Sequence, residues 1–263
     1  MKKVVINDVE LAYADNGYGQ PIVFLHAFPL NQNMWKDQVT DLNPSYRVIT
    51  FDWRGFGESS LGRAKPSISV FADDLAKLLD HLEIEDVTIC GLSMGGYAAF
   101  AFFRQYPNRV KALILCDTKA GSDTEEIKQG RYETAKTIHK KGISVLVDTM
   151  VPRLLGETTI KSRPQITECI REMIKTAQPE GVAQALTAMA ERKDSSDLLP
   201  QITCPTMIIV GDEDKLTPPS EAVKMSQAIG SSQLAVIRNA GHLPNIEQPV
   251  IFDRIVDDFM SRL

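Results

Sequence analysis

The stretch DVTICGLSMGGYAAFAFF, residues 86–103, runs from β-branched residues through a serine among glycines into an alanine- and phenylalanine-rich segment. Ser93 lies close to Gly91, Gly95 and Gly96, where a strand is expected to end and a helix to begin. Such a turn strains the serine backbone, while the glycines let strand and helix approach without Cβ clashes. The pattern Gly-x-Ser-x-Gly therefore predicts a hydroxyl raised above the carboxyl edge of a sheet, at a helix N-terminus.

The apolar runs on either side of this turn predict a doubly wound α/β fold with a mostly parallel sheet. An antiparallel hairpin is expected at the N-terminus, around Asn7 and Asp8. The later runs are continuous rather than alternating, which is typical of strands buried on both faces of a parallel sheet. Helical patterns separate several of them, as a doubly wound sheet requires. The expected strands are PIVFL (21–25), RVITF (47–51), VTIC (87–90), ALILC (112–116), TMIIV (206–210) and LAVI (234–237).

Two helical patterns flank the core. Residues 70–82 repeat apolar side chains at a spacing of three and four, and we expect Asp73 and Asp74 in the first turn, where the helix dipole favours acids. The closing segment begins near Pro249 and has apolar side chains on one face.

Residues 120–200 interrupt this alternation with no convincing strand and with four helical patterns, at 125–142, 143–156, 166–177 and 182–192. A segment of this length is far longer than a usual crossover. We therefore predict an α/β core in residues 1–119 and 201–263 and an inserted helical cap, or lid, in residues 120–200. Apolar side chains of the cap are expected to contact substrate from above, in particular Met150, Leu154 and Met189.

Composition limits the classes of partner. The chain has 263 residues, a formal net charge of −5 and no block of like charges, so nucleic acid and anionic membrane surfaces are not expected partners. The N-terminal stretch has no uninterrupted apolar region, and no run reaches the roughly 18–20 residues that span a bilayer. The four cysteines show no CxxC pair and are interpreted as small buried hydrophobes in a reducing compartment. We expect a cytoplasmic protein with a small-molecule substrate.

A serine hydroxyl needs a base, and the chain has four histidines. His242 follows the last expected strand and lies in a turn set by Gly241 and Pro244, so it reaches the same carboxyl edge as the serine. His26 directly follows a strand and is expected to shape its loop. His81 and His139 are expected at the surface. His242 is thus the predicted general base.

The acid that would orient this histidine is less sharply defined. Asp52, Asp117, Asp212 and Asp214 all follow expected strands. The chain order serine, acid, histidine favours the loop after TMIIV, and within it Asp214, because Asp212 is close enough to the strand to tie its own turn. Asp52 is expected to organise its loop with Arg54. Asp117 remains the competing candidate for the acid.

The chain resembles the α/β-hydrolase superfamily over nearly its whole length, because five motifs occur in that family's order. By this resemblance Ser93 is the nucleophile, His242 the base and Asp214 the orienting acid. The motifs are HAFPL (26–30), FDWRGFGESS (51–60), GLSMGG (91–96), GDEDKLTPP (211–219) and AGHLPNIEQP (240–249).

The resemblance also implies an oxyanion hole made of two backbone N–H groups. One belongs to Met94, the residue after the nucleophile, and the second to the loop after the third strand. Pro29 has no N–H group, so Phe28 is the expected second donor, and its ring is expected to wall the acyl pocket. The usual glycine of this loop is replaced by Ala27, which would be strained if the position required positive φ.

Within the superfamily the chain is similar to small bacterial carboxylesterases, 3-oxoadipate enol-lactonases and cofactor-free haloperoxidase-like hydrolases. We predict a serine carboxylesterase for small or medium acyl esters, with no metal or organic cofactor. An enol-lactonase must hold a free carboxylate, and the cap offers Arg131, Lys136 and Arg153 without a spacing that singles one out. That activity is the second interpretation, a perhydrolase or acyltransferase the third, and a non-catalytic receptor on the same fold stays open.

Overall fold

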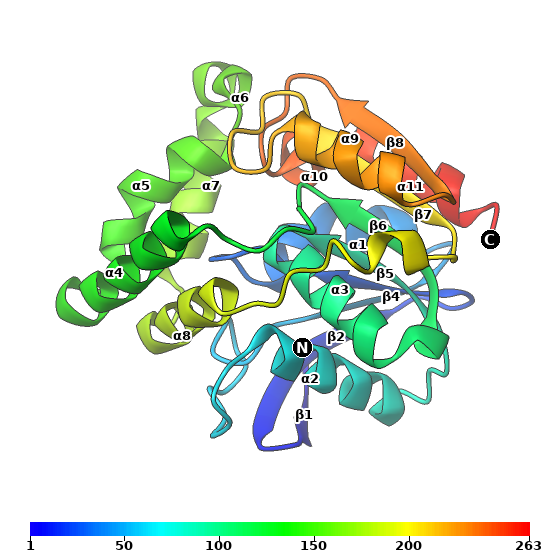
Figure 1. Ribbon diagram of the computed structural model, residues 1–263, viewed down its shortest axis with the longest axis horizontal. Helices are drawn as coiled ribbons and strands as arrows, with labels where there is room; N and C mark the ends of the chain where they lie inside the picture. The colour runs from blue at the N-terminus through cyan, green and yellow to red at the C-terminus, as the bar shows by residue number, and fades with distance from the viewer.

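A computed structural model describes residues 1–263 and contains one mixed sheet of eight strands, in the order β1-β2-β4-β3-β5-β6-β7-β8 (Figure 1). The first hairpin is antiparallel, β2 is antiparallel to β4, and the remaining neighbours are parallel. The predicted fold class and N-terminal hairpin are therefore confirmed. The strands are β1 (Lys2–Ile6), β2 (Val9–Asn16), β3 (Pro21–Leu25), β4 (Arg47–Phe51), β5 (Val87–Leu92), β6 (Val110–Cys116), β7 (Thr206–Gly211) and β8 (Ser232–Ile237).

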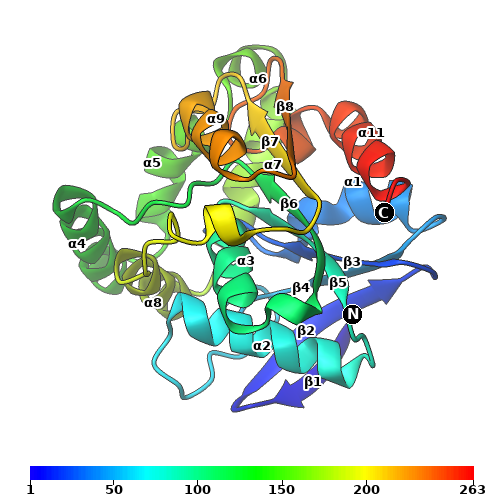
Figure 2. The same ribbon diagram turned by 45° about the vertical axis from the view of Figure 1, so that its right-hand side comes forward.

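Helices cover both faces of this sheet. Figures 1 and 2 show α2, α3 and α9 on one face and α1 and α11 on the other. The helices of the core are α1 (Lys36–Leu42), α2 (Ile68–His81), α3 (Met94–Gln105), α9 (Pro219–Ala228), the short α10 (Pro244–Glu247) and α11 (Pro249–Met260). None of the helices is both long and apolar enough to cross a membrane.

The central strands are buried on both faces, as their continuous apolar runs predict, but β8 is not. Leu234 and Val236 of β8 are 37% and 49% exposed. The expectation that this run is buried on both faces was wrong, because β8 pairs only with β7 and forms the edge of the sheet.

The segment between β6 and β7, called the helical insertion here (residues 120–200), contains no strand and gathers at one end of the sheet, on the left in Figure 1. Four of its helices fall where the sequence pattern predicts them, and a short fifth one, α6, was not expected. Its helices are α4 (Glu125–Lys141), α5 (Ser144–Leu154), α6 (Glu157–Ser162), α7 (Pro164–Lys175) and α8 (Pro179–Ala190).

Two local expectations need correction. Cys90 and Cys116 are buried within β5 and β6, but Cys169 is exposed on α7 and Cys204 is only partly buried. Helix α2 begins earlier than its apolar pattern suggests, because Ser67 caps it by accepting a hydrogen bond from the N–H of Val70. Asp74 is consequently past the first turn, and it is fully buried.

Candidate active site

The turn at Ser93 has the strained geometry that its glycines suggest. Ser93 has φ 56° and ψ −110° between β5 and α3. Its N–H donates to the carbonyl of Cys116 at 2.9 Å, and its own carbonyl accepts from the hydroxyl of Thr118 at 2.9 Å. A Cβ atom on Gly91 would lie 2.5 Å from the carbonyl oxygen of Gly95, so a side chain there would prevent the turn. Ser93 is partly exposed while both chain neighbours are buried.

Asp214 and His242 meet at the carboxyl ends of β7 and β8. Nδ1 of His242 lies 2.8 Å from Oδ2 of Asp214, and both side chains are buried. Thr217 donates its hydroxyl to the same carboxylate oxygen at 2.7 Å. An N–H on Nδ1 that donates to Asp214 leaves Nε2 free to act as a base.

The environment of Asp214 favours its ionised form. Burial opposes ionisation, but the charge of His242 and hydrogen bonds from His242, Thr217 and the N–H of Leu216 hold the pKa of Asp214 below its usual range. The carboxylate can therefore stabilise a histidinium ion during a proton transfer.

Glu247 connects the segment that carries His242 (residues 240–249, called the His242 loop) to the helical insertion. Its Oε1 accepts from the N–H groups of Gly241 and Leu243, at 2.8 and 3.2 Å, on either side of His242. Its Oε2 accepts from the N–H of Gly156, at 2.8 Å, in the turn between α5 and α6. The N–H of His242 itself donates to the carbonyl of Leu154 at 3.0 Å. The position of His242 therefore depends on the insertion as well as on the core.

The loop that carries Asp214 makes a second link to the insertion, at the start of α6. The carboxylate of Glu213, next to Asp214, accepts from both the N–H and the hydroxyl of Thr158, the second residue of α6. The α5–α6 turn and the start of α6 are thus held by the two loops that carry the predicted base and acid.

The backbone N–H groups of the two predicted oxyanion donors, Met94 and Phe28, make no hydrogen bond within the protein. Met94 is the first residue of α3, where a helical N–H has no partner within the helix. Phe28 lies in the loop after β3, and its N–H makes no hydrogen bond within the protein. Ala27 does not have positive φ, so alanine is accommodated there without that strain.

The other histidines make contacts that suit structural roles. His26 is fully buried, accepts from the N–H of Trp53 at 3.1 Å, and has its pKa lowered to about 4 by burial. It is therefore neutral and shapes the loops after β3 and β4, as predicted. His81 and His139 are exposed, the first beside the hydroxyl of Tyr13.

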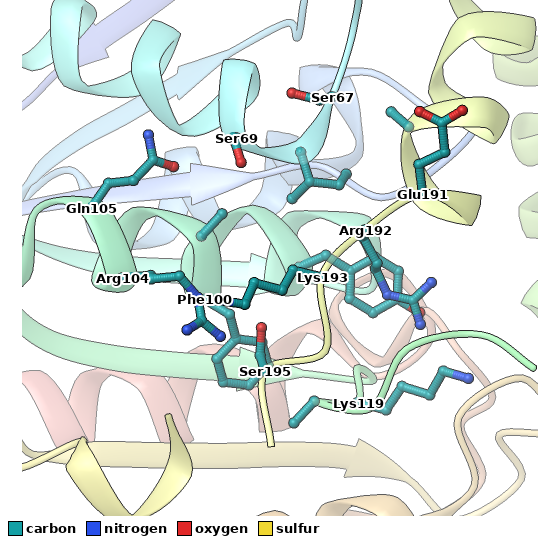
Figure 3. A pocket seen from close by; sticks show the side chains of 15 residues that line it. Ser67, Ser69, Phe100, Arg104, Gln105, Lys119, Glu191, Arg192, Lys193 and Ser195 are labelled. Carbon is teal, nitrogen blue, oxygen red and sulfur yellow. The ribbon is translucent and has the colours of Figure 1, made fainter. Parts of the chain in front are cut away.

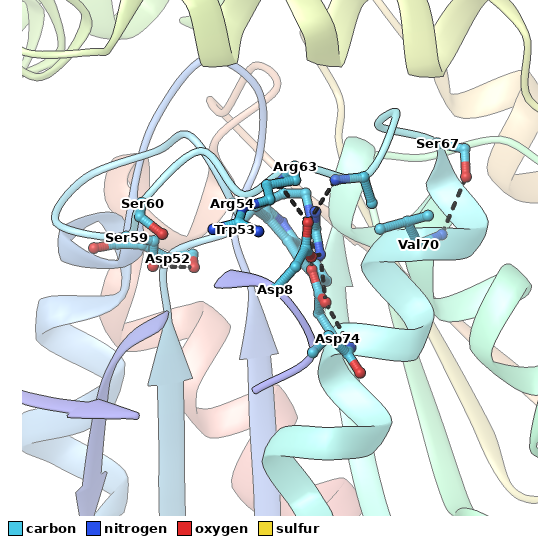
Figure 4. Close-up of polar contacts among 12 residues, drawn as sticks. Asp8, Asp52, Trp53, Arg54, Ser59, Ser60, Arg63, Ser67, Val70 and Asp74 are labelled. Atoms are coloured by element: carbon cyan, nitrogen blue, oxygen red, sulfur yellow. Dashed lines mark hydrogen bonds and ion pairs between the residues drawn. The ribbon is translucent and has the colours of Figure 1, made fainter. Parts of the chain in front are cut away.

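Asp52 organises its loop, but Arg54 does not act with it. The two carboxylate oxygens of Asp52 accept from the N–H groups of Gln32 and Glu58, at 2.8 and 3.0 Å. Arg54 instead makes a double hydrogen bond to the buried Asp74 of α2, at 2.7 and 2.8 Å, and reaches Asp8 at 3.1 Å (Figure 4). This cluster fixes the loop after β4 to α2 and to the N-terminal hairpin.

Asp117, the competing acid, follows β6 and makes no hydrogen bond to His242. Its Oδ1 accepts from the N–H of Gly211 at 2.9 Å. Asp117, Asp214 and His242 nevertheless each offer an oxygen or nitrogen atom within 4.8 Å of the others. Nδ1 of His242 already bonds to Asp214, so Asp117 is not the hydrogen-bond partner of that nitrogen.

The residues predicted to contact substrate differ in exposure. Leu154 and Met189 are buried, whereas Met150 is only half-buried against the apolar core. Phe28 is buried and its ring lies edge-on to Phe56. Phe28, Leu154 and Met189 belong to the apolar core, and Met150 packs against it.

A buried carboxylate in the first linker of the insertion pairs with two arginines. Asp123 lies 2.6 Å from Nε of Arg131 on α4 and 2.8 Å from a terminal nitrogen of Arg192, which follows α8. Arg192 also stacks on Tyr97, four residues after Ser93, with its guanidinium carbon 4.1 Å from the ring centroid. The cluster joins the two ends of the insertion to each other and to α3.

A cavity of about 200 Å³ lies where these two linkers meet α2 and α3, and none of the predicted triad residues lines it (Figure 3). Arg104, Lys119, Arg192 and Lys193 line it, but Arg104 pairs with Asp197, and both Lys119 and Arg192 pair with Asp123. Three of these four cations are therefore already in ion pairs with carboxylates. The cavity is therefore separate from the loops that carry the predicted triad.

Several functional neighbours were missed from the sequence. Thr217, Glu213 and Glu247 lie inside the acid and histidine motifs, so proximity to those motifs was the available signal. Asp123 had no such signal, because its partners lie 8 and 69 residues away in the chain.

Comparisons with known proteins agree with the fold. A family model described as alpha/beta hydrolase fold matches residues 20–249. The 3-oxoadipate enol-lactonase 2 of Acinetobacter baylyi is 30% identical over 97% of this chain and 94% of its own. A malate-bound structure of a thermophilic esterase from Thermogutta terrifontis is 43% identical, with a TM-score of 0.97 and coverage of 100% of this chain and 99% of that chain. The enol-lactonase of Burkholderia xenovorans is 28% identical, with a TM-score of 0.91 over 99% of this chain and 100% of that chain. The chain therefore belongs to the α/β-hydrolase family and is a hydrolase similar to both esterases and enol-lactonases.

Proposed function

We propose that this protein is a serine carboxylesterase that cleaves small to medium carboxylic esters through an acyl-enzyme on Ser93. The observation that carries the proposal is the buried Asp214–His242 pair at 2.8 Å, at the same edge of the sheet as the strained, partly exposed Ser93. A nucleophilic serine requires such a base and such an orienting group.

In the proposed mechanism His242 Nε2 takes the proton of Ser93 Oγ as that oxygen attacks the ester carbonyl. The carbonyl oxygen becomes an oxyanion that accepts hydrogen bonds from the N–H groups of Met94 and Phe28. Asp214 stays ionised and stabilises the histidinium ion, which then protonates the leaving alcohol. Water attacks the acyl-enzyme with the same histidine as base, and Ser93 regains its proton as the acid product leaves.

The charges of the insertion favour a neutral acyl group over one with a free carboxylate. Of the three basic side chains considered for such a carboxylate, Lys136 and Arg153 are exposed. Arg131 is bound to Asp123 and also contacts the sulfur of Met189 at 3.6 Å. An anionic substrate would have to compete with Asp123 for this arginine, whereas a neutral ester would not.

We assign to the helical insertion the role of a cap over Ser93, with Phe28, Met150, Leu154 and Met189 as apolar contacts of the substrate. The direct link of the α5–α6 turn to the His242 loop supports this placement. A cytoplasmic location stays a prediction from composition, as does a small ester or lactone substrate without a nucleic-acid or membrane partner.

An enol-lactonase is the second candidate, and the Acinetobacter and Burkholderia relatives are the observation that favours it. The test is hydrolysis of p-nitrophenyl esters from acetate to decanoate beside 3-oxoadipate enol-lactone, with the same enzyme preparation. We expect higher kcat/KM on the short esters than on the lactone. Fast lactone opening with slow ester cleavage would replace the proposal by the second candidate, and Arg131→Ala would then lower lactone kcat/KM selectively.

A further inference from the structure

We propose that Asp117 is a second carboxyl group of the acid–base site: it carries a proton, donates a hydrogen bond to Asp214, and so positions the acid that orients His242. The inference rests on the proposed function, because it concerns the residues assigned there as acid and base. Asp117 would be a positioning residue, since it acts through Asp214 and does not touch the substrate.

The first support is the position of a buried oxygen without a partner. Asp117 is 1% exposed, and its Oδ1 accepts from the N–H of Gly211. Its Oδ2 is buried and has no hydrogen-bond partner. Asp117, Asp214 and His242 each offer an atom within 4.8 Å of the others. A buried carboxylate oxygen without a donor is costly, but the same oxygen with a proton becomes a donor beside an acceptor.

The second support is the charge of the surroundings. The oxygens of Asp214 accept from the N–H groups of Leu216 and Thr217, from the Thr217 hydroxyl and from His242, so Asp214 holds the negative charge. No Lys or Arg pairs with Asp117, and the titratable groups around it are Asp214, His242 and Cys116. Burial, followed by the charge of Asp214, raises the pKa of Asp117 well above its usual range. Ionising both carboxyl groups would place two like charges within 4.8 Å of each other in a buried site, which disfavours the second ionisation.

The arrangement has two consequences for the site. A single negative charge faces the His242 imidazole, because the second carboxyl group is neutral. The proton of Asp117 and its bond to Gly211 also tie the end of β6 to Gly211, which ends β7, and to the acid loop that follows. Asp117 therefore limits the basicity of Asp214 and fixes the orientation of its carboxylate.

The backbone at this position suggests which substitution tests the idea. Asp117 has φ 42°, in the left-handed region that Asn and Asp tolerate better than other non-glycine residues. Asp117→Asn keeps the backbone and imitates the neutral acid, because its amide can donate to Asp214 and accept from Gly211. Asp117→Ala removes both hydrogen bonds and adds backbone strain. Asp212→Asn is the matched control, because Asp212 is an exposed acid on the Asp214 loop.

The primary experiment is infrared spectroscopy of the substrate-free protein at neutral pH, taken as the difference between the wild type and each variant. We expect the wild type minus Asp117→Asn spectrum to contain the carbonyl stretch of a protonated carboxyl group, shifted in D2O, and the wild type minus Asp212→Asn spectrum to lack it. The band of Asp253, whose pKa burial raises to about 7, cancels in both differences. Absence of the band from the wild type minus Asp117→Asn spectrum would overturn the proposal. Because no turnover is involved, failure of the esterase proposal leaves this result unaffected.

Kinetics then separates positioning from a purely structural role. Asp117→Asn should lower kcat severalfold and leave the acidic limb of the kcat/KM profile in place. Asp117→Ala should lower kcat by about 10-fold or more, as loss of a hydrogen bond to a charged group does, and move that limb to higher pH because Asp214 becomes more basic. A limb that moves to lower pH in Asp117→Asn would mean that a negative charge was removed, which contradicts a neutral Asp117. If the acidic limb of the kcat/KM profile stays at the same pH in a folded Asp117→Ala, Asp117 has only a structural role.

Discussion

Two buried carboxylates, Asp214 in the acid loop and Asp123 in the first linker of the insertion, meet their partners in opposite ways. Asp214 accepts from neutral donors and from one histidine that must gain and lose a proton. Asp123 is paired with the permanently charged Arg131 and Arg192. The first arrangement keeps a proton mobile, and the second holds two ends of a segment together.

The contrast extends to the regions around them. Loops at the carboxyl edge of the sheet bring the ionisable side chains of Asp214 and His242 into hydrogen-bond distance. The insertion instead contributes apolar side chains, and arginines neutralise its buried carboxylate, Asp123. We infer that the edge of the sheet determines the reaction and the insertion determines which ester reaches it. The two regions are joined by Glu247, which holds the loop of His242 and the α5–α6 turn together.

The strongest way to break this division is to remove the nucleophile or the base. Ser93→Ala and His242→Ala should each lower kcat by about 10⁶-fold, as loss of a member of a cooperating triad does. The double variant should be no worse than either single one, because the two residues act as a unit. Steady-state ester hydrolysis measures all three. Additive losses in the double variant would contradict a shared step.

Replacement of the predicted acid, Asp214, should cause the next largest loss of kcat. Asp214→Asn preserves shape but removes the charge that orients and stabilises the histidine, so we expect a loss of about 10⁴-fold in kcat with KM little changed. The comparison is with Asp117→Asn in the same assay. A larger loss in Asp117→Asn than in Asp214→Asn would exchange the roles of the two residues.

Glu247 tests the link between the regions. Glu247→Gln can no longer accept at both oxygens, so the N–H of Gly156 or those beside His242 lose a partner. We expect kcat to fall by about 10-fold, the cost of a hydrogen bond to a charged acceptor. Glu126→Gln, an exposed glutamate on α4, is the control and should behave as wild type. Unchanged kcat in a folded Glu247→Gln would show that the insertion does not position the base.

Asp123 should affect stability with little effect on the chemical step. Burial opposes its ionisation, but hydrogen bonds from Arg192 and Arg131 lower the pKa of Asp123 to about 2. Its contribution to stability is thus complete above the unfolded pKa of about 4 and lost as pH falls through about 2. Thermal unfolding should show Asp123→Asn less stable at neutral pH, by on the order of 3 kcal/mol, because two arginines lose their partner. The difference in the free energy of unfolding between Asp123→Asn and the wild type should become smaller as the pH falls toward 2. A gap that is constant with pH would contradict the assigned ionisation.

The sequence predicts elements with local requirements better than contacts between distant segments, for a physical reason. Strand runs such as PIVFL and turns such as GLSMGG have local requirements for burial or backbone angle, so neighbouring residues reveal them. The α6 helix, the exposed edge at β8 and the Arg54–Asp74 pair depend on contacts between distant segments. Glu247 is intermediate, because it lies inside the histidine motif while one of its partners, Gly156, lies 91 residues away.

The central claim is a covalent acyl-enzyme on Ser93, and the most direct measurement is mass spectrometry of the protein after reaction with a fluorophosphonate. The account predicts one adduct per chain, on the peptide that contains Ser93, with slow labelling of His242→Ala and none of Ser93→Ala. A p-nitrophenyl ester should be turned over many times by the unlabelled wild type and not by the labelled protein. An adduct on another residue, or ester turnover that survives labelling of Ser93, would contradict the account.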